Sequence, residues 1–169
     1  MNEDHMDRTD AALLVIRCVL GLFLAVHGVN KTRSINGTAG WFASIGMKWP
    51  GAQARVAAAT EIAGGLALAA GFLFPLAAAA VTATMVVAIV TVHRKVGFFI
   101  FLPNGGWEYC ATIAICASAL SLAGPGRASV DNAAGLFAST GAGAAGIVLG
   151  LVAPALHLAL TWRPGAVSK

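Results

Sequence analysis

The stretch TEIAGGLALAAGF, residues 60–72, is an apolar run that carries one carboxylate, Glu61. It shows no period-two alternation, so it predicts a membrane helix rather than a barrel strand. On that helix Glu61 shares a face with Gly64, Gly65 and Leu68. Small residues beside a polar one are typical of a face that packs against another helix and not against lipid. The stretch therefore predicts a packed helix whose carboxylate points into a bundle.

The whole chain has the composition of a membrane protein. Of its 169 residues, 58% are hydrophobic and only 11% are charged, whereas soluble domains carry about 25% charged residues. We therefore expect an integral membrane protein with one compact bundle. The formal net charge of +4 does not predict nucleic-acid binding, because most basic residues lie in short loops beside apolar segments, where they set orientation.

Five segments are long enough to cross the hydrocarbon layer as helices, which takes about 20 residues. They cover residues 11–30, 55–72, 75–93, 106–123 and 141–162. We expect an all-α fold in which residues 11–131 form a four-helix transmembrane bundle. An acidic tail, residues 1–10, precedes the bundle, and a Gly/Ala-rich extension, residues 132–169, adds a fifth, C-terminal transmembrane helix.

The long connection from residue 31 to residue 54 is expected to hold a short helix in the membrane interface, between the first two transmembrane helices. Its large apolar residues are interleaved with glycine, serine and threonine: Ile35, Trp41, Phe42, Ile45 and Met47. The alternative is an irregular loop that ends at Trp49-Pro50.

The basic residues indicate the orientation of the bundle. With five spans, the loops 31–55 and 93–105 share one side with the C-terminus. That side holds eight of the basic residues, namely Lys31, Arg33, Lys48, Arg55, Arg94, Lys95, Arg163 and Lys169, and the other side holds Arg8 and Arg127. The positive-inside rule then predicts that the N-terminus lies outside and the C-terminus in the cytoplasm.

Ionisable side chains inside a membrane are costly, so each needs a partner or a hydrated cavity. By depth, four or five helices bring such groups to the basic side: His27, Lys31, Glu61, His93, Glu108 and His157. Arg17 lies on the same narrow face of the first helix as Lys31. Each residue has a simpler interpretation. Glu61 could form a structural ion pair with Lys31 or Arg17. Arg17 could instead pair with a lipid phosphate or Asp131, and the histidines and basic residues could be interfacial.

Glu108 lies in NGGWEY, residues 104–109, between Trp107 and Tyr109. It begins a predicted helix, where a carboxylate suits the positive end of the helix dipole. It also faces the predicted layer of polar groups. The three cysteines, Cys18, Cys110 and Cys116, lie within apolar segments without a C-x-x-C pair, so they predict core residues and no metal site.

In order and spacing, five motifs resemble those of the DoxX family of small bacterial membrane proteins. They are HGVNK (27–31), NGTAGWFASIGMKWP (36–50), TEIAGGLALAAGF (60–72), GGWEY (105–109) and GPGRASVD (124–131). The resemblance covers about residues 12–131, and the extension after Asp131 departs from the family pattern. It implies the four-helix bundle, a place in the bacterial cytoplasmic membrane, and a set of family residues. By motif match these are Arg17, His27, Gly28, Lys31, Glu61, Gly64, Gly65, His93, Gly106, Glu108 and the turn 124–131.

The family is similar to membrane subunits linked with thiosulfate:quinone oxidoreductase. The first hypothesis is therefore a membrane subunit of a quinone-linked oxidoreductase complex. A quinone head group needs proton donors and acceptors near the interface and an apolar slot for its tail. Glu61 and Glu108 would exchange protons, and His27 or His93 would hydrogen-bond a ring carbonyl. Lys31, Trp107, Tyr109 and Arg17 would complete the site, and electrons would come from a partner subunit.

Other functions remain open. A purely structural or anchoring subunit would use the polar layer only to lock the bundle. A b-type haem protein would take two of His27, His93 and His157 as axial ligands, although we expect a quinone rather than haem and no covalent cofactor. A small-molecule carrier is a further alternative, and the absence of a clear inverted repeat and of a helix broken at mid-membrane weighs against it. Homo-oligomerisation is compatible with each hypothesis.

Overall fold

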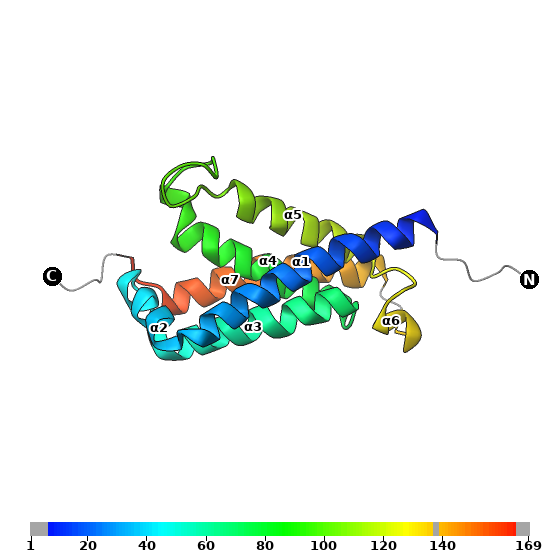
Figure 1. Cartoon of the computed structure of the whole chain (residues 1–169), viewed down its shortest axis with the longest axis horizontal. Helices are drawn as coiled ribbons and strands as arrows, with labels where there is room; N and C mark the ends of the chain where they lie inside the picture. Colours follow the sequence, from blue (N-terminus) through cyan, green and yellow to red (C-terminus); the bar gives the residue numbers. More distant parts are fainter. Residues whose placement is uncertain (1–6, 137–138, 165–169) are drawn as a thin grey trace, which may run out of the picture.

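The computed structural model describes residues 7–136 and 139–164, and in these residues the fold is built from helices (Figure 1). The predicted all-α class is confirmed. The elements are α1 (Arg8–Arg33), α2 (Ile35–Ser44), α3 (Pro50–Ala70), α4 (Phe74–Thr91), the 3-10 helix η1 (His93–Lys95), α5 (Glu108–Ala123), α6 (Val130–Ala133) and α7 (Thr140–Thr161). Residues 1–6 of the predicted acidic tail, and Lys169 of the predicted basic side, lie outside the described residues.

All five predicted transmembrane segments contain a helix, but they are not equally apolar. Within the described residues, α1, α4 and α7 are long and apolar enough to cross a membrane. Two of the five expected spans differ: α5 is an apolar helix of only 16 residues, and α3 has 21 residues but includes Arg55 and Glu61. The polar part of α3 borders a pocket, and the short helix α5 follows a long loop. Both are described below.

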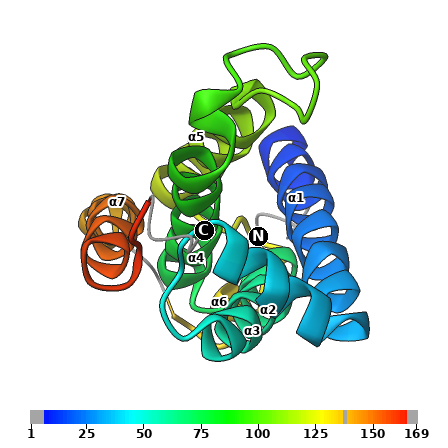
Figure 2. The ribbon, with the colours of Figure 1, turned by 90° about the vertical axis from the view of Figure 1, so that its left-hand side faces the viewer.

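The helices form one bundle in which α1, α4 and α7 run in one direction and α3 and α5 in the other (Figure 1). Viewed from its end, α4 lies in the middle, with α3, α5 and α7 against it and α1 alongside α3 (Figure 2). The main core lies around α4 and includes Leu24, Leu68, Phe74, Val81 and Ala117, all nearly or fully buried. We call the end where α1, α4 and α7 terminate the basic end, and the opposite end the capping end.

Helices α1 and α3 pack together along most of their length, and two glycines allow their backbones to meet. A Cβ atom on Gly21 would collide with the carbonyl oxygen of Gly65, and a Cβ atom on Gly65 would collide with that of Gly21. Small residues are the usual means of close approach between membrane helices. The packing face predicted for Gly64 and Gly65 therefore has α1 as its partner at Gly65.

The capping end is closed by hydrogen bonds to helix ends. The buried carboxylate of Asp131 accepts the backbone N–H groups of Leu73 (2.8 Å) and Phe74 (2.9 Å), where α4 begins. Arg17, also buried, donates to the carbonyl oxygens of Ala69 and Ala128. The predicted pairing of Arg17 with Asp131 is thus wrong, because each side chain instead satisfies backbone groups that helix ends leave free.

At the basic end, α2 confirms the short helix predicted between residues 31 and 54. Its membrane position stays a prediction. The segment after α2 pairs with the end of α7: the N–H of Lys48 donates to Thr161 (2.7 Å), and that of Arg163 donates to Gly46 (2.9 Å). The indole N–H of Trp162 adds a bond to the carbonyl of Ile45 (2.7 Å). The α7 extension is therefore tied to the α2–α3 connection.

We expect Gly65→Ala to lower the free energy of unfolding by about 1–3 kcal/mol, because the added methyl group must push α1 away from α3. Thermal unfolding in detergent micelles measures the effect. Gly40→Ala in α2 is the control, since a Cβ atom there meets no atom within 4 Å. Equal stability of Gly65→Ala and the native chain would show that the two helices are not in close contact.

We expect Asp131→Ala to cost about 1–3 kcal/mol, because two backbone N–H groups at the start of α4 lose their acceptor. Asp131→Asn keeps one carbonyl oxygen and should cost less. The same unfolding measurement applies, with Val130→Ala as an exposed neighbour. A loss no larger than that of Val130→Ala would contradict the capping role.

Candidate functional site

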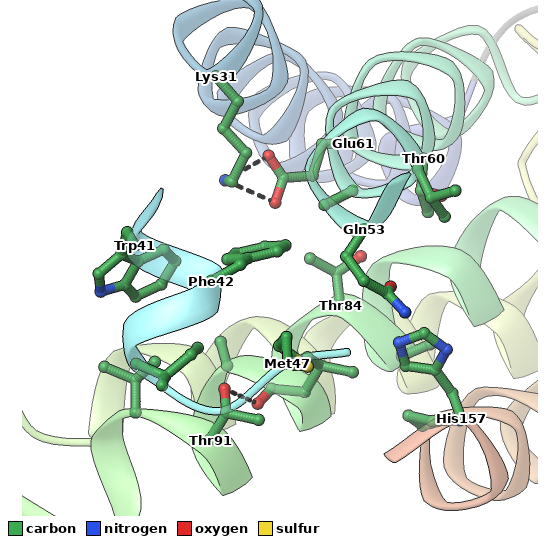
Figure 3. Close-up of a pocket in the computed structure, with 18 of the residues that line it drawn as sticks. Lys31, Trp41, Phe42, Met47, Gln53, Thr60, Glu61, Thr84, Thr91 and His157 are labelled. Carbon is green, nitrogen blue, oxygen red and sulfur yellow. Dashed lines mark hydrogen bonds and ion pairs between the residues drawn. The ribbon is translucent and has the colours of Figure 1, made fainter. Parts of the chain in front are cut away.

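A mostly apolar pocket of about 270 Å³ lies among α2, α3, α4 and α7, toward the basic end (Figure 3). Trp41 and Phe42 of α2 form one wall, and Met47 lies in the connection that follows α2. Helix α4 supplies Val87 and several smaller side chains, and α7 supplies Ala153, Pro154 and His157. The pocket therefore combines the α2–α3 region with the C-terminal extension.

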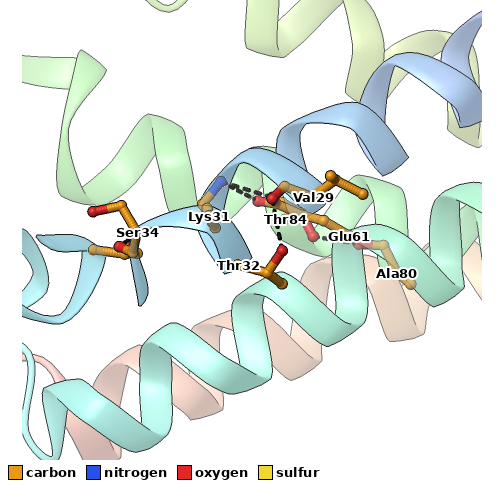
Figure 4. Close-up of polar contacts among 8 residues, drawn as sticks. Val29, Lys31, Thr32, Ser34, Glu61, Ala80 and Thr84 are labelled. Carbon is orange, nitrogen blue, oxygen red and sulfur yellow. Dashed lines mark hydrogen bonds and ion pairs between the residues drawn. The ribbon is translucent and has the colours of Figure 1, made fainter. Parts of the chain in front are cut away.

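An ion pair forms the most polar part of the pocket wall. The Nζ atom of Lys31 lies 2.8 Å and 2.7 Å from the two carboxylate oxygens of Glu61. Figures 3 and 4 show this pair between α1 and α3. The Glu61 side chain is only 6% exposed and that of Lys31 is 22% exposed. The ion pair that we weighed as the alternative for Glu61 is therefore present, and it also borders a cavity.

The close approach of α1 to α3 positions this pair. Gly28 lies one turn before Lys31, and a Cβ atom there would come within 2.9 Å of the Glu61 Cβ and 2.7 Å of the Ile62 Cγ1. With Gly28 in this position, the four-carbon stem of Lys31 follows the surface of α3 and its ammonium group reaches the carboxylate. The HGVNK motif therefore serves to bring a cation to Glu61.

Further polar side chains line the pocket (Figure 3). The hydroxyl groups of Thr84 and Thr91 donate to carbonyls of their own helix, those of Ala80 (2.9 Å; Figure 4) and Val87 (2.8 Å). In the described part of the chain, the side chains of Gln53 and Thr60 make no hydrogen bond, and His157 has a long contact of 3.5 Å from Nε2 to Thr161 Oγ1. Gln53, Thr60 and His157 can therefore bond a ligand without breaking a strong existing contact.

Two predicted site residues on α1 lie away from the pocket. Arg17 is 14 residues before Lys31, about 21 Å along the helix, and belongs to the capping end. His27 is exposed and lines a separate surface depression together with Asn30 and Arg33. Both residues lie on the first helix, as predicted. Arg17 faces backbone carbonyls at the capping end and His27 faces the surface, so neither side chain reaches the pocket.

The polar residues between α4 and α5 build a loop rather than the pocket. A ring nitrogen of His93, Nδ1, lies 2.8 Å from the carbonyl oxygen of Gly105. The Glu108 carboxylate accepts the N–H of Ile100 (3.1 Å), and Trp107 packs edge-on against Phe98. Tyr109 is exposed. Of the predicted site residues, only Lys31 and Glu61 meet in the pocket, and His157 joins them from the extension.

One pattern in the sequence could have identified pocket residues that were not predicted. Gln53, Ala57, Thr60 and Glu61 are spaced as i, i+4, i+7 and i+8, which places them on one face of α3. This face continues the one that was predicted from Glu61. For Trp41 and Phe42 the sequence carried no such signal, because their place depends on how α2 folds back over α3.

Comparisons with known proteins agree with this geometry. The DoxX family profile matches residues 12–94. The chain is 32% identical over 96 residues to the protein named "Putative oxidoreductase CatD" of Bacillus subtilis (strain 168), which covers 57% of this chain and 68% of that protein. No solved structure matches the chain. The matched part contains α2, α3, α4 and the Lys31–Glu61 pair, and the resemblance drawn from the motifs is confirmed: the chain belongs to the DoxX family of membrane proteins.

Proposed function

We propose that the chain is a membrane subunit of a quinone-linked oxidoreductase complex and that its pocket binds the quinone head group. One observation carries the proposal: the Lys31–Glu61 pair, whose carboxylate is buried, borders an apolar pocket. Small-molecule sites have this character, with mostly apolar walls and a few polar groups that orient the ligand. The name of the Bacillus subtilis relative, which includes the word oxidoreductase, supports the same class of activity.

The size of the pocket suits part of a quinone. Its volume of about 270 Å³ is near the lower end of the range of about 300–1,000 Å³ found for drug-sized ligands. A single substituted ring fills such a space, and an isoprenoid tail would extend beyond it along the apolar helix surfaces. Trp41, which is half exposed, offers an aromatic face where ring and tail join.

The polar groups can handle the protons of quinone reduction. Conversion of a quinone to a quinol takes up two electrons and two protons. Glu61 would pass protons to one ring oxygen, and Lys31 would hold the carboxylate in place and neutralise it. Gln53 or His157 would hydrogen-bond another ring substituent. Lysine, glutamate and histidine side chains exchange protons and glutamine only hydrogen-bonds, whereas none of them carries electrons, so a partner subunit would supply the electrons.

The proposal also includes a location for the protein. We place it in the bacterial cytoplasmic membrane with the basic end in the cytoplasm. Arg55, Arg94 and Arg163 of the basic end are exposed, as the positive-inside rule requires of cytoplasmic loop residues. The pocket would then lie toward the cytoplasmic leaflet, within reach of a soluble or peripheral electron donor.

Binding of decylubiquinol, the reduced form of a short-tailed quinone, tests the proposal on the purified full chain in lipid nanodiscs. Tryptophan fluorescence quenching would give the dissociation constant. We expect Glu61→Gln to weaken binding about tenfold or more, because the carboxylate that accepts from a quinol hydroxyl is lost; tenfold corresponds to about 1.4 kcal/mol. Gln53→Leu should also weaken binding while leaving the ion pair intact.

Two controls make this test specific. Glu108→Gln changes a carboxylate of the same predicted polar layer that does not line the pocket, so this variant should bind decylubiquinol as the native chain does. Decylbenzene has the tail without the quinone ring and reports simple partitioning. Equal affinity of Glu61→Gln and the native chain, or equal losses in Glu61→Gln and Glu108→Gln, would exclude the pocket as the quinone site.

The Lys31–Glu61 pair also favours a second candidate, a subunit that only anchors partners and uses the pair to lock α1 to α3. A double-mutant cycle separates the two. We expect Lys31→Met and Glu61→Gln each to cost about 1–3 kcal/mol, less than a fully buried pair, because Lys31 is partly exposed. The double variant removes both charges and should recover part of this loss.

The quinone affinity of the double variant then decides between the candidates. If decylubiquinol still binds weakly although thermal unfolding shows that stability has recovered, the pair acts on the ligand. If affinity recovers together with stability, the pair is only a helix lock, and the anchoring function is favoured.

A further inference from the structure

The connection from η1 to α5, residues 96–107, presents a cluster of apolar side chains, and we call it the aromatic loop. Phe98, Phe99 and Ile100 are about half exposed, and Phe101 is 78% exposed. Phe99 and Phe101 stack with ring centroids 5.0 Å apart. Figures 1 and 2 show that the loop projects sideways from the bundle near its basic end, beside α5, rather than extending beyond that end.

The backbone of the aromatic loop is partly hydrogen-bonded within the loop and its flanks. The N–H groups of Gly106 and Glu108 donate to Phe99 (3.0 Å) and Phe98 (2.9 Å), and that of Trp107 donates to Gly97 (3.0 Å). Irregular backbone is costly in a lipid environment unless its polar groups find partners. The internal bonds lower the cost of placing this loop at the membrane interface, where head groups and water can meet the N–H groups of Phe98, Phe99 and Phe101, which have no partner among the described residues.

Two residues of the GGWEY motif close the loop. A Cβ atom on Gly106 would collide with the carbonyl oxygens of Phe98 and Phe99, so only glycine allows the two arms to meet. The Glu108 carboxylate accepts the N–H of Ile100, which would otherwise point outward at the apolar tip. The motif thus fixes the conformation that exposes Phe99 and Phe101.

The charges beside the aromatic loop are mostly basic, and the carboxylate next to it, that of Glu108, is engaged by the Ile100 N–H. Arg94 and Lys95 are exposed at its base, and residues 93–107 include no aspartate or glutamate. Basic side chains beside an apolar surface are typical of segments that lie at the interface of an anionic membrane.

We propose that the aromatic loop inserts Phe99, Ile100 and Phe101 into the bilayer at the boundary of head groups and acyl chains, with Arg94 and Lys95 on the phosphates of anionic lipid. When the bundle lies across a membrane, the loop reaches the boundary of head groups and acyl chains, because it projects sideways from the ends of α4 and α5. The loop would anchor the α4–α5 end independently of any ligand in the pocket.

Spin-label accessibility tests this proposal on the full chain in bilayers of phosphatidylcholine and phosphatidylglycerol. A nitroxide at Phe101→Cys, in a chain with Cys18, Cys110 and Cys116 replaced by alanine, should collide with oxygen more than with a water-soluble nickel chelate. Ile115→Cys on the exposed face of α5 serves as the lipid reference and Ala134→Cys as the water reference. A label at Phe101 that matches Ala134 overturns the proposal, because a loop waiting for a protein partner would be wet.

Two further measurements cover the remaining parts of the proposal. Phe101→Trp in the chain with its native cysteines should add fluorescence that brominated phospholipids quench, and no added quenching would overturn insertion. The double variant Arg94→Gln/Lys95→Gln should make the Phe101 label more accessible to the nickel chelate in bilayers with phosphatidylglycerol. In pure phosphatidylcholine it should have no such effect. An equal effect, or none, in both bilayers would overturn the role of anionic lipid.

Discussion

The close approach of α1 to α3 is the contact on which the rest of the structure depends. Gly21 and Gly65 let the two backbones meet, and Gly28 lets α1 follow α3 past Glu61. Only at this separation can the Nζ atom of Lys31 contact both carboxylate oxygens of Glu61. In lipid the hydrophobic effect does not drive helices together, so van der Waals packing of small residues and polar contacts must do so. The glycine contacts and the ion pair therefore support each other, and together they fix one wall of the pocket.

The two ends of the bundle use polar side chains in different ways. At the capping end, Asp131 and Arg17 bond to backbone groups of helix ends and the segments beside them, so their bonding capacity serves the fold. At the basic end, Gln53 and His157 face the pocket with capacity to spare. Among the buried side-chain atoms of the described residues only the Nε atom of Arg17 lacks a partner, whereas Gln53 and His157 are partly exposed to the pocket, so a ligand or water there can satisfy them. This contrast is why the pocket, rather than the equally polar capping end, is the candidate site.

The sequence predicted the helices well because the bilayer sets their length and the apolar runs report it directly. It also predicted that Glu61 lies on a packed face and that Lys31 is one of its two candidate partners, since both statements need only the helical repeat. The expected depth of a residue in the membrane could not show what surrounds His27, His93 and Glu108. Residues at one depth can face lipid, pocket or loop, and the choice depends on helix rotation and on connections such as the hydrogen bond from Ile100 to Glu108. The pocket itself depends on how α2 folds back and where α7 docks, which no local pattern encodes.

The position of α7 gives the pocket a composite origin. The family profile ends at residue 94, so the ion pair and the α2, α3 and α4 walls lie in the matched part, whereas Pro154 and His157 lie beyond it. Helix α7 reaches α4 and α5 through its buried Gly143, Gly146 and Gly150, and its end is tied to the segment after α2. The charged group that would handle protons thus belongs to the shared family core, while the wall that limits ligand shape and offers His157 comes from the extension. In this arrangement the chemistry and the selectivity of the site can vary independently.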